Sequence, residues 1–511
     1  RQGAFDFVGG LSYAQEGLFH DADGRAIAVD TVQGDLMDAR SANLFAKLGW
    51  DLGERRRLQA SVNRYRLRGD GDYTTVPGDY LAGIPATSTE GEPPLDPPRN
   101  DVTSLSLDYT DRDLATGYFQ GQLFWTRFEA LYGSFGYTDF FGPGTGLWLD
   151  QSRIDAEKVG GKFTWSRDGF GELPLRLTFG LDLLRDRTEQ SMQASGLGWV
   201  PPSVYESVSP LLQAEYRIGA RLLLTGGLRH ERARIRVDDY VTQPRYGSQF
   251  VEGGSQDARE TLRNFGAVYD VSDALKLYAS YAEGYTVADI GRVLRGISTP
   301  GQRVEDLVDL TPVIADNREI GVDYDDGRWS AHVAAYWSDS DLGSLLIFDS
   351  ASNSYNVQRQ ATRIRGIEAN LAWQATEDTR VGLAHARAQG EYDSNGDDRV
   401  DSDLQGINIS PDRTTAFWEQ RWTPGFSTRL QASHAADRGF ERRGVEVSRF
   451  AGYTTVDLQG QVALPLGRLA FGVENLLGRQ YITYYSQTTP SDEDYVAGRG
   501  RVFSVNWSHR F

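Results

Sequence analysis

Cysteine is absent from this chain of 511 residues, and methionine occurs only twice. Without cysteine the protein can form no disulfide, no thiolate metal site and no cysteine nucleophile. The six histidines are scattered, and the sequence contains neither an HExxH zinc motif nor a GxSxG nucleophile motif. A phosphate-binding GxxxxGK[ST] loop is also missing. We therefore expect a protein that is not an enzyme and that requires no cofactor.

Long hydrophobic runs are missing as well. No window approaches the roughly 18 consecutive apolar residues of a transmembrane helix, so that element is excluded. A membrane barrel remains open, because its strands are only half apolar and barely raise the mean hydropathy. The formal net charge of −18 argues against a nucleic-acid partner, which would favour a basic stripe. Acidic surface loops on a secreted or outer-membrane protein explain this charge more simply.

Glycine and aromatic residues are abundant, with 56 Gly, 25 Tyr, 23 Phe and 11 Trp. This enrichment suits strands, tight turns and the aromatic girdles of a membrane interface. Short connections such as Asp326-Gly327 and Thr423-Pro-Gly425 alternate with much longer polar ones. The long connections lie near residues 68–100, 132–149, 188–202, 238–256, 286–315, 391–410, 438–449 and 484–496. A membrane barrel shows this alternation because one rim faces the periplasm and the other carries the functional loops.

The segments between these connections alternate with a period of two. In 453–464, Val456 and Leu458 alternate with Asp457, Gln459 and Gln461. A charge at mid-depth on the lipid face would cost about 2–4 kcal/mol, so the polar positions are expected to face the lumen. We predict about twenty strands, at 1–17, 37–51, 55–67, 101–110, 115–131, 150–166, 172–187, 203–217, 219–237, 257–270, 274–285, 316–325, 328–348, 354–373, 379–391, 411–422, 426–436, 450–464, 468–482 and 497–511. An even number places both ends of the chain at the short-turn rim.

The last strand is the most informative of the twenty. One of its faces is formed by Phe503, Val505, Trp507, His509 and Phe511. The intervening positions are Ser504, Asn506, Ser508 and Arg510. A soluble sandwich could contain such a strand, but a terminal strand that ends on an aromatic residue is typical of bacterial outer-membrane barrels. We therefore predict an all-β fold, a large antiparallel transmembrane β-barrel.

From about residue 450 onward, the chain resembles the TonB-dependent outer-membrane receptors of ferric siderophores. The motifs that carry the resemblance are Gly452-Tyr-Thr-Thr-Val-Asp-Leu458, Phe471-Gly-Val-Glu-Asn-Leu-Leu-Gly-Arg-Gln-Tyr481 and Gly498-Arg-Gly-Arg-Val-Phe503. Upstream, Tyr278–Tyr285, Asn317–Asp323 and Asn43–Trp50 are similar to mid-barrel and early strands of that family. Within the family, the ferric aerobactin (citrate-hydroxamate) branch resembles the chain most.

The resemblance implies a barrel of about twenty-two strands filled by an N-terminal plug domain that contacts TonB. We find neither a plug nor a TonB-contacting segment, and Arg1 aligns best with the third strand of the family. The expectation is therefore that 1–511 is a receptor barrel without its plug and first hairpin, a miscounted strand being the alternative. The chain also has no signal-peptide pattern. In such a barrel, Phe503–Phe511 would meet the strand that begins at Arg1.

The function implied by the resemblance is active transport of a ferric siderophore across the bacterial outer membrane, energised by TonB. The implied partners are the siderophore, TonB, outer-membrane lipid and lipopolysaccharide, and the receptor is expected to be a monomer. Uptake of another ligand, such as cobalamin or a saccharide, is one alternative. A passive diffusion porin, which typically has about 16–18 strands, and a soluble β adhesin are the others.

Anionic, oxygen-rich chelates favour Arg forks for their charge and aromatic faces for packing. The candidate ligand-binding residues in the predicted loops and upper lumen are Arg245, Tyr246, Phe250, Arg292, Arg295, Arg303, Trp148, Trp199, Tyr484, Tyr485 and Tyr495. The alternative is that these residues form aromatic girdles and lumen salt bridges.

An acidic loop is a candidate Ca²⁺ site, because Ca²⁺ binds six to eight oxygens and alternate acidic residues around a turn can supply them. Its candidate ligands are Asp393, Asn395, Asp397, Asp401 and Asp403. The loop differs from an EF-hand, with Asp398 at the position of the usual Gly and Leu404 at that of the usual Glu. A solvated acidic loop is the alternative. Any Fe³⁺ is expected only as part of the siderophore chelate.

Overall fold

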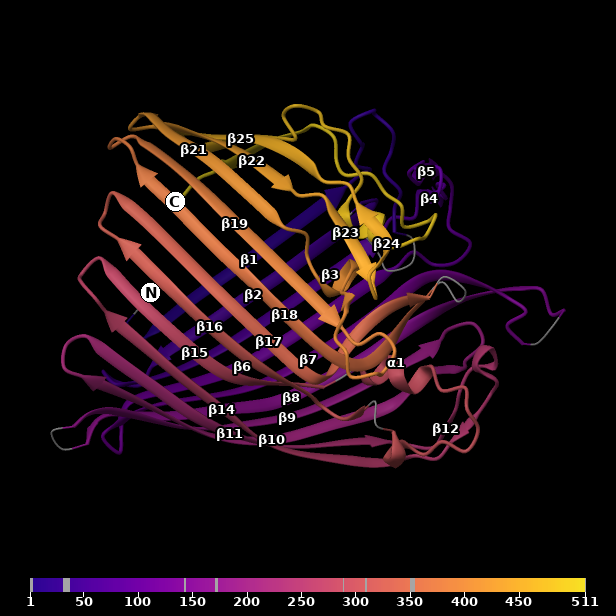
Figure 1. Cartoon of the computed structure of the whole chain (residues 1–511), viewed down its shortest axis with the longest axis horizontal. Coiled ribbons are helices and arrows are strands. Elements are labelled where there is room, and N and C mark those ends of the chain that lie inside the picture. The colour runs from indigo at the N-terminus through magenta and orange to yellow at the C-terminus, as the bar shows by residue number, and fades with distance from the viewer. Residues whose placement is uncertain are drawn as a thin grey trace.

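The computed structural model describes residues 3–30, 37–141, 144–170, 173–287, 289–307, 310–349 and 354–510. Its strands form one sheet of 23 strands and two small hairpins. Three strands of the large sheet are short, namely β20 (Ser402–Asp403), β23 (Arg438–Arg442) and β24 (Val445–Phe450). The other twenty pair antiparallel, each with the next long strand along the chain, in the up-and-down order that a barrel requires (Figure 1).

The long strands correspond one to one with the twenty predicted from the sequence. They are β1 (Phe5–Glu16), β2 (Ala39–Asp51), β3 (Arg56–Gly69), β6 (Arg99–Leu114), β7 (Gly117–Thr138), β8 (Leu147–Phe170), β9 (Leu173–Met192), β10 (Gly198–Ile218), β11 (Leu222–Val237), β14 (Gly254–Asp270), β15 (Leu275–Thr286), β16 (Val313–Asp325), β17 (Trp329–Asp349), β18 (Ser354–Gln374), β19 (Thr379–Tyr392), β21 (Arg413–Thr423), β22 (Phe426–Ala435), β25 (Tyr453–Leu464), β26 (Gly467–Glu474) and β27 (Val502–Ser508).

The remaining elements lie in the long loops. They are the hairpin strands β4 (Tyr73–Val76), β5 (Thr87–Glu90), β12 (Tyr240–Val241) and β13 (Phe250–Val251), the helices α1 (Ile290–Arg295) and α2 (Tyr484–Thr488), and the 3₁₀ turns η1 (Pro244–Tyr246), η2 (Val304–Asp306) and η4 (Gly406–Asn408). No helix in the described ranges is long and apolar enough to cross a membrane.

Two of the predicted boundaries near the C-terminus are wrong. Strand β27 begins at Val502 and not at residue 497, and strand β26 ends at Glu474 and does not continue to residue 482. The next residue, Asn475, has a positive φ of 46° and turns the chain away from the sheet. Its side-chain amide donates to the carbonyl oxygens of Arg479 and Arg499, at 2.8 and 3.1 Å, and these bonds hold the irregular segment before β27.

The two faces of the sheet differ as the period-two pattern predicts. Large apolar side chains such as Leu48, Leu107 and Ile367 are exposed on the outer face. At the short-turn rim the outer face carries stacked aromatic pairs, including Phe5 with Trp50 at 5.5 Å. Trp329 and Trp373 stack at 5.4 Å between ring centroids. Aromatic pairs in this position are typical of a membrane-interface girdle.

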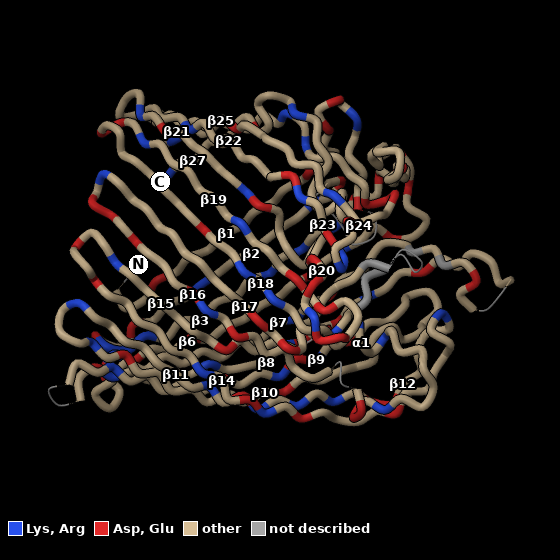
Figure 2. Tube along the Cα trace, viewed as in Figure 1, with Lys and Arg blue, Asp and Glu red and all other residues tan. Residues whose placement is uncertain are grey.

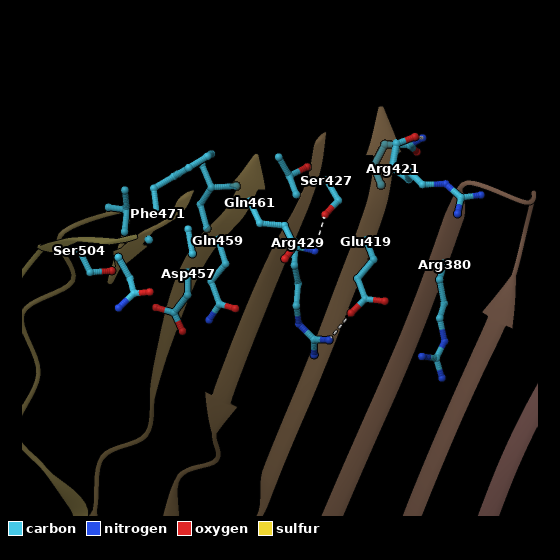
Figure 3. A pocket seen from close by; sticks show the side chains of 18 of the residues that line it. Arg380, Glu419, Arg421, Ser427, Arg429, Asp457, Gln459, Gln461, Phe471 and Ser504 are labelled. Atoms are coloured by element: carbon cyan, nitrogen blue, oxygen red, sulfur yellow. Dashed lines mark hydrogen bonds and ion pairs between the residues drawn. The ribbon is translucent and has the colours of Figure 1, made fainter. Parts of the chain in front are cut away.

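The inner face is polar. Near the short-turn rim it lines a hollow of about 690 Å³, to which β25 contributes Asp457, Gln459 and Gln461, the three positions predicted to face the lumen. Figure 3 shows Arg429 and Glu419 turned toward each other in this hollow, where they form an ion pair of 2.5 Å. The wall therefore separates an apolar exterior from a wet interior.

The first and last strands do not close the sheet in the described part of the chain. There, β1 pairs only with β2, and β27 only with β26. The expectation that Phe503–Phe511 pairs with the first strand is therefore wrong for the described residues; Phe511 itself lies outside them. Phe5 is opposite Trp50 and Ser508 opposite Arg468, so both outer ends lie at the short-turn rim, as predicted.

Loop contacts join the two edges at the opposite rim. Gln480 donates to Asp21 at 2.9 Å, and its side-chain oxygen accepts the backbone N–H of Ala22 at 2.9 Å. The backbone N–H of Gly500 donates to the carbonyl of His20 at 2.8 Å. The loop after β1 thus packs against the segment before β27, where the strands themselves are unpaired.

Candidate functional site

Helix α1 lies within the rim that carries the long loops (Figure 1). It contacts both β10 and β18, although β11, β14, β15, β16 and β17 separate these two strands in the sheet. An element that touches two such distant parts of one curved wall must extend across the mouth. The described residues of this loop, 289–307, therefore reach inward over the lumen.

A hydrophobic cluster holds α1 in this position. Leu294 is fully buried against a group of apolar residues from the tops of β11 and β13 and from the same loop, namely Ile235, Val237, Val251, Ile297, Val304 and Leu310. Tyr240 adds a hydrogen bond of 2.8 Å from its hydroxyl to the carbonyl oxygen of Leu294. Burial also raises the pKa of Tyr240, so the hydroxyl remains a donor at neutral pH.

The helix begins at a side-chain cap. Asp289 accepts the backbone N–H of Arg292 at 3.0 Å, and its second oxygen forms an ion pair of 3.0 Å with the Arg292 guanidinium. Sequence reasoning assigned 286–315 to a loop and missed this helix. An Asp directly before Ile290 was the available signal, but a helix of six residues gives little periodicity.

Five of the predicted ligand-binding residues come together around α1. The Arg295 guanidinium lies over the ring of Trp199 at 5.0 Å, and the Arg245 guanidinium lies over the ring of Tyr246 at 5.0 Å. Arg245, Tyr246 and Arg292 all act electrostatically on Arg295. Residues from β10, η1 and α1 thus form one group, which we call the mouth cluster: Trp199, Arg245, Tyr246, Arg292 and Arg295.

The mouth cluster gathers three positively charged side chains, Arg245, Arg292 and Arg295. Burial lowers the pKa of Arg295; Tyr246 and Asp289 oppose this effect, whereas Arg292 and Arg245 add to it. Arginine nevertheless stays protonated at neutral pH. The cluster therefore brings three guanidinium groups together near the carboxylate of Asp289, with Asp30 also acting on this neighbourhood, in a partly desolvated position where Coulomb interactions are stronger than in water. Such a site attracts an anion.

Tyr132, on β7, belongs to the same neighbourhood, since it interacts electrostatically with Arg292 and Arg295. It was not among the predicted residues. Its position in the sequence, inside a predicted long connection, gave no sign that β7 would extend to Thr138 and carry it into the mouth.

The other predicted ligand-binding residues lie elsewhere. Arg303 is surrounded by carboxylates, with Glu252 at 3.6 Å, Glu305 at 3.5 Å and Asp306 at 3.9 Å. Phe250 is exposed on β13. Trp148 packs edge-on against Phe141 at 5.1 Å in the hairpin of β7 and β8.

Residues from the last loop also lie outside the mouth cluster. Tyr484 packs at 5.0 Å against Phe450 in a separate hydrophobic core, where burial raises its pKa to about 12. Tyr485, its neighbour on α2, is exposed. Tyr495 contacts Tyr80 edge-on at 5.4 Å, which ties the last loop to the loop of β4 and β5.

In the acidic loop, Asp393 accepts hydrogen bonds from backbone N–H groups of the same loop. Its carboxylate accepts the N–H groups of Asn395, Gly396 and Asp398 at 2.8–3.1 Å. Burial acts to raise the pKa of Asp393, but these bonds outweigh it and lower the pKa. Within the described ranges no three His, Cys, Asp or Glu side chains are arranged to hold a metal ion. Ca²⁺ binding by Asp393, Asn395, Asp397, Asp401 and Asp403 stays a prediction.

Comparison with known proteins agrees with this architecture. Residues 48–476 match the family described as TonB dependent receptor-like, beta-barrel. The chain belongs to this family. It is therefore a TonB-dependent receptor barrel of the bacterial outer membrane, as the sequence motifs predicted.

Among its relatives, the ferric aerobactin receptor of Klebsiella pneumoniae is 26% identical, over 98% of this chain and 73% of that protein. The rhizobactin receptor of Rhizobium meliloti (strain 1021) is 23% identical, over 97% of this chain and 71% of that protein. The solved structure of the copper transporter OprC superposes with a TM-score of 0.76 at 15% identity, covering 98% of this chain and 75% of that one. At this identity the structural likeness establishes the fold alone.

Proposed function

We propose that this receptor takes up a ferric siderophore across the outer membrane in a process energised by TonB. The observation that carries the proposal is the mouth cluster, three arginines and two aromatic rings gathered by α1 in the opening of a TonB-dependent receptor barrel. Receptors named for ferric aerobactin and rhizobactin among the relatives support a chelate as the ligand.

The chemistry of the cluster suits an anionic chelate. Guanidinium groups donate paired hydrogen bonds to carboxylate oxygens, and aromatic faces pack against the ligand's flat or apolar groups. Cobalamin and neutral saccharides carry less negative charge than an anionic chelate, so they suit three arginines less well. They are the alternative ligands. A passive porin would need no such cluster on an inward-reaching helix.

In this proposal the receptor moves its ligand unchanged and is not an enzyme. It requires no cofactor, and Fe³⁺ enters only within the chelate. TonB acts on a plug that fills the wide lumen, and 1–511 supplies the barrel. The receptor works as a monomer embedded in outer-membrane lipid and lipopolysaccharide. Ca²⁺ in the acidic loop would be structural.

Binding of ferric aerobactin to the purified receptor tests the proposal. Replacing Arg292 and Arg295 together by Ala should weaken binding by about two orders of magnitude, because each charged hydrogen bond contributes about 1.5–3 kcal/mol. Titration with tryptophan fluorescence as the readout would measure the affinity, with cobalamin and maltose as competitors.

Arg303→Ala is the matched comparison, since three carboxylates already offset that charge on the same rim. We expect its affinity to stay within about twofold of the unmodified receptor. Unchanged affinity in the R292A/R295A variant, or displacement of the chelate by cobalamin or maltose, would contradict the proposal.

A further inference from the structure

The loop that carries α1 returns to the barrel wall through a segment with little regular structure. After the helix the chain passes through η2, which has only three residues, before it enters β16. Val304 and Leu310 of this part of the loop are buried in the hydrophobic cluster together with Leu294. Residues 304–307 and 310–312 thus support α1 from below, and we call them the return segment.

A glutamine of the neighbouring wall holds the first half of the return segment. Gln256 lies at the long-loop end of β14, opposite Ile235 of β11, which belongs to the same hydrophobic cluster. Its side-chain amide donates to the carbonyl oxygens of Val304 and Leu307, at 2.9 and 2.8 Å. The carbonyl oxygen of Glu305 lies 3.3 Å from the same nitrogen. One NH₂ group, with its two hydrogens, therefore holds a whole turn of backbone.

An arginine on the other side of the loop holds the second half. Arg359, on β18, donates to the carbonyl oxygens of Thr311 at 2.9 Å and Pro312 at 3.4 Å. It also donates to the carbonyl oxygen of Leu342 on β17, at 3.1 Å. Leu342 lies where the register of β17 and β18 shifts, which frees its carbonyl from the ladder. The planar guanidinium thus joins the return segment to this bulge.

The position of the return segment matters for the charge that a ligand meets at the mouth. Both blue and red segments lie close to α1 in the view of Figure 2. Gln256 and Arg359 are half-buried, so their hydrogen bonds compete with little water. A return segment released from both side chains would no longer support Leu294, and α1 would shift together with its arginines.

We propose that Gln256 and Arg359 are positioning residues of the mouth cluster: they fix the return segment, and the return segment fixes α1 with Arg292 and Arg295. In this proposal they act on the ligand only through the loop. The consequence for chelate binding rests on the proposed function, whereas the effect on the loop does not.

Gln256→Glu tests the first grip with almost no change of shape. At pH 7 the carboxylate has no hydrogen to donate and faces the carbonyl oxygens of Val304 and Leu307, so it should release the return segment. In the full-length receptor, hydrogen–deuterium exchange within 289–307 should become about tenfold faster, and ferric aerobactin should bind about tenfold more weakly. This is the effect of losing about one or two hydrogen bonds.

A pH profile of this variant separates positioning from general loosening. A protonated glutamic acid again donates one hydrogen bond, so the exchange should approach that of the unmodified receptor as the pH falls from 7 to about 4. The charged and titratable side chains of the elements around position 256 are Glu252, Arg303, Glu305 and Asp306 of the loops and Tyr205, Asp257 and Tyr285 of the wall. Both proteins contain them, so a comparison at one pH isolates position 256.

Arg359→Met tests the second grip, because it keeps a long unbranched side chain and removes the donors. It should speed exchange within 289–307 like Gln256→Glu, but without recovery at low pH. Asn408→Leu is the matched control, since Asn408 makes the same kind of bond elsewhere on the rim. Its side chain bonds the backbone N–H and carbonyl of Leu346, at 3.0 and 2.7 Å. This control should alter neither exchange within 289–307 nor chelate binding.

Unchanged exchange within 289–307 in both test variants, or an equal increase in the Asn408→Leu control, would overturn the proposal. An unchanged chelate affinity in a variant with faster exchange would overturn it as well. If the unmodified receptor bound no chelate, the proposed function would fail, and the exchange data alone would decide whether Gln256 and Arg359 position the loop. Heat-modifiable gel mobility verifies that the barrel of each variant is folded.

Discussion

At the scale of single residues, the carboxylate of Asp21 joins the loops at the two unpaired edges of the described sheet. Its side chain is nearly buried, forms an ion pair with Arg25 at 2.8 Å and accepts the Gln480 amide at 2.9 Å. Burial acts to raise its pKa, but the hydrogen bonds from Arg25 and Gln480 outweigh this and lower the pKa below the ordinary 3.8. Deprotonated Asp21 is therefore the form that joins the loop after β1 to the segment before β27.

The lowered pKa of Asp21 determines how the stability of this loop contact depends on pH. A carboxyl with a lowered folded pKa contributes stability above its unfolded pKa of 3.8, and that contribution is lost as the pH falls through the folded value. We expect Asp21→Asn to speed proteolysis between β1 and β2 at pH 7, and the difference from the unmodified receptor to disappear as the pH falls below 3.8 and through the lowered pKa of the folded state. A difference that persisted at the lower pH would contradict the assignment. Asp23→Asn, at an exposed neighbour, is the control.

At the scale of elements, helix α1 depends on Leu294. With only six residues the helix is too short to be stable alone, so its buried leucine and its Asp289 cap must hold it. Leu294→Ala should cost about 2–5 kcal/mol of local packing. We expect faster proteolysis within 286–312 and weaker chelate binding, with heat-modifiable mobility of the barrel unchanged.

The control for that prediction is Leu81→Ala, since Leu81 is 93% exposed in the loop of β4 and β5. It should alter neither proteolysis nor binding. If Leu294→Ala left both unchanged as well, α1 would not be the element that organises the mouth.

The regular elements were largely predictable from the sequence, whereas the mouth was not. In β25, Val456 and Leu458 alternate with Asp457 and Gln459 because lipid and water face opposite sides of one strand. Trp199, Arg245 and Arg292, in contrast, are far apart in the sequence and meet only because the loops fold inward. One sequence alone contains no periodic pattern that predicts contacts between residues so far apart. The unpaired edges of β1 and β27 likewise depend on the whole sheet.

At the scale of the whole molecule, the absence of cysteine allows the orientation to be mapped with single substitutions. Leu81→Cys places a thiol on the long-loop rim and Asp273→Cys places one in the tight turn between β14 and β15. In intact cells a membrane-impermeant maleimide should label the first and spare the second. After the outer membrane is permeabilised, both should react. Labelling of Asp273→Cys in intact cells would show that the orientation is the opposite of the one expected.

The alternation in β11 has a further consequence for the evolution of this receptor. Inward residues of the strand support the helix that carries the arginines of the mouth, and outward residues meet the surrounding membrane. An insertion or deletion of one residue in β11 would exchange the inward and outward residues. The outward arginines Arg232, Arg234 and Arg236 would then point into the hydrophobic cluster that supports α1, and Ile235 would face the lipid headgroups. Changes in the length of this strand should therefore be tolerated only when two residues are added or removed together.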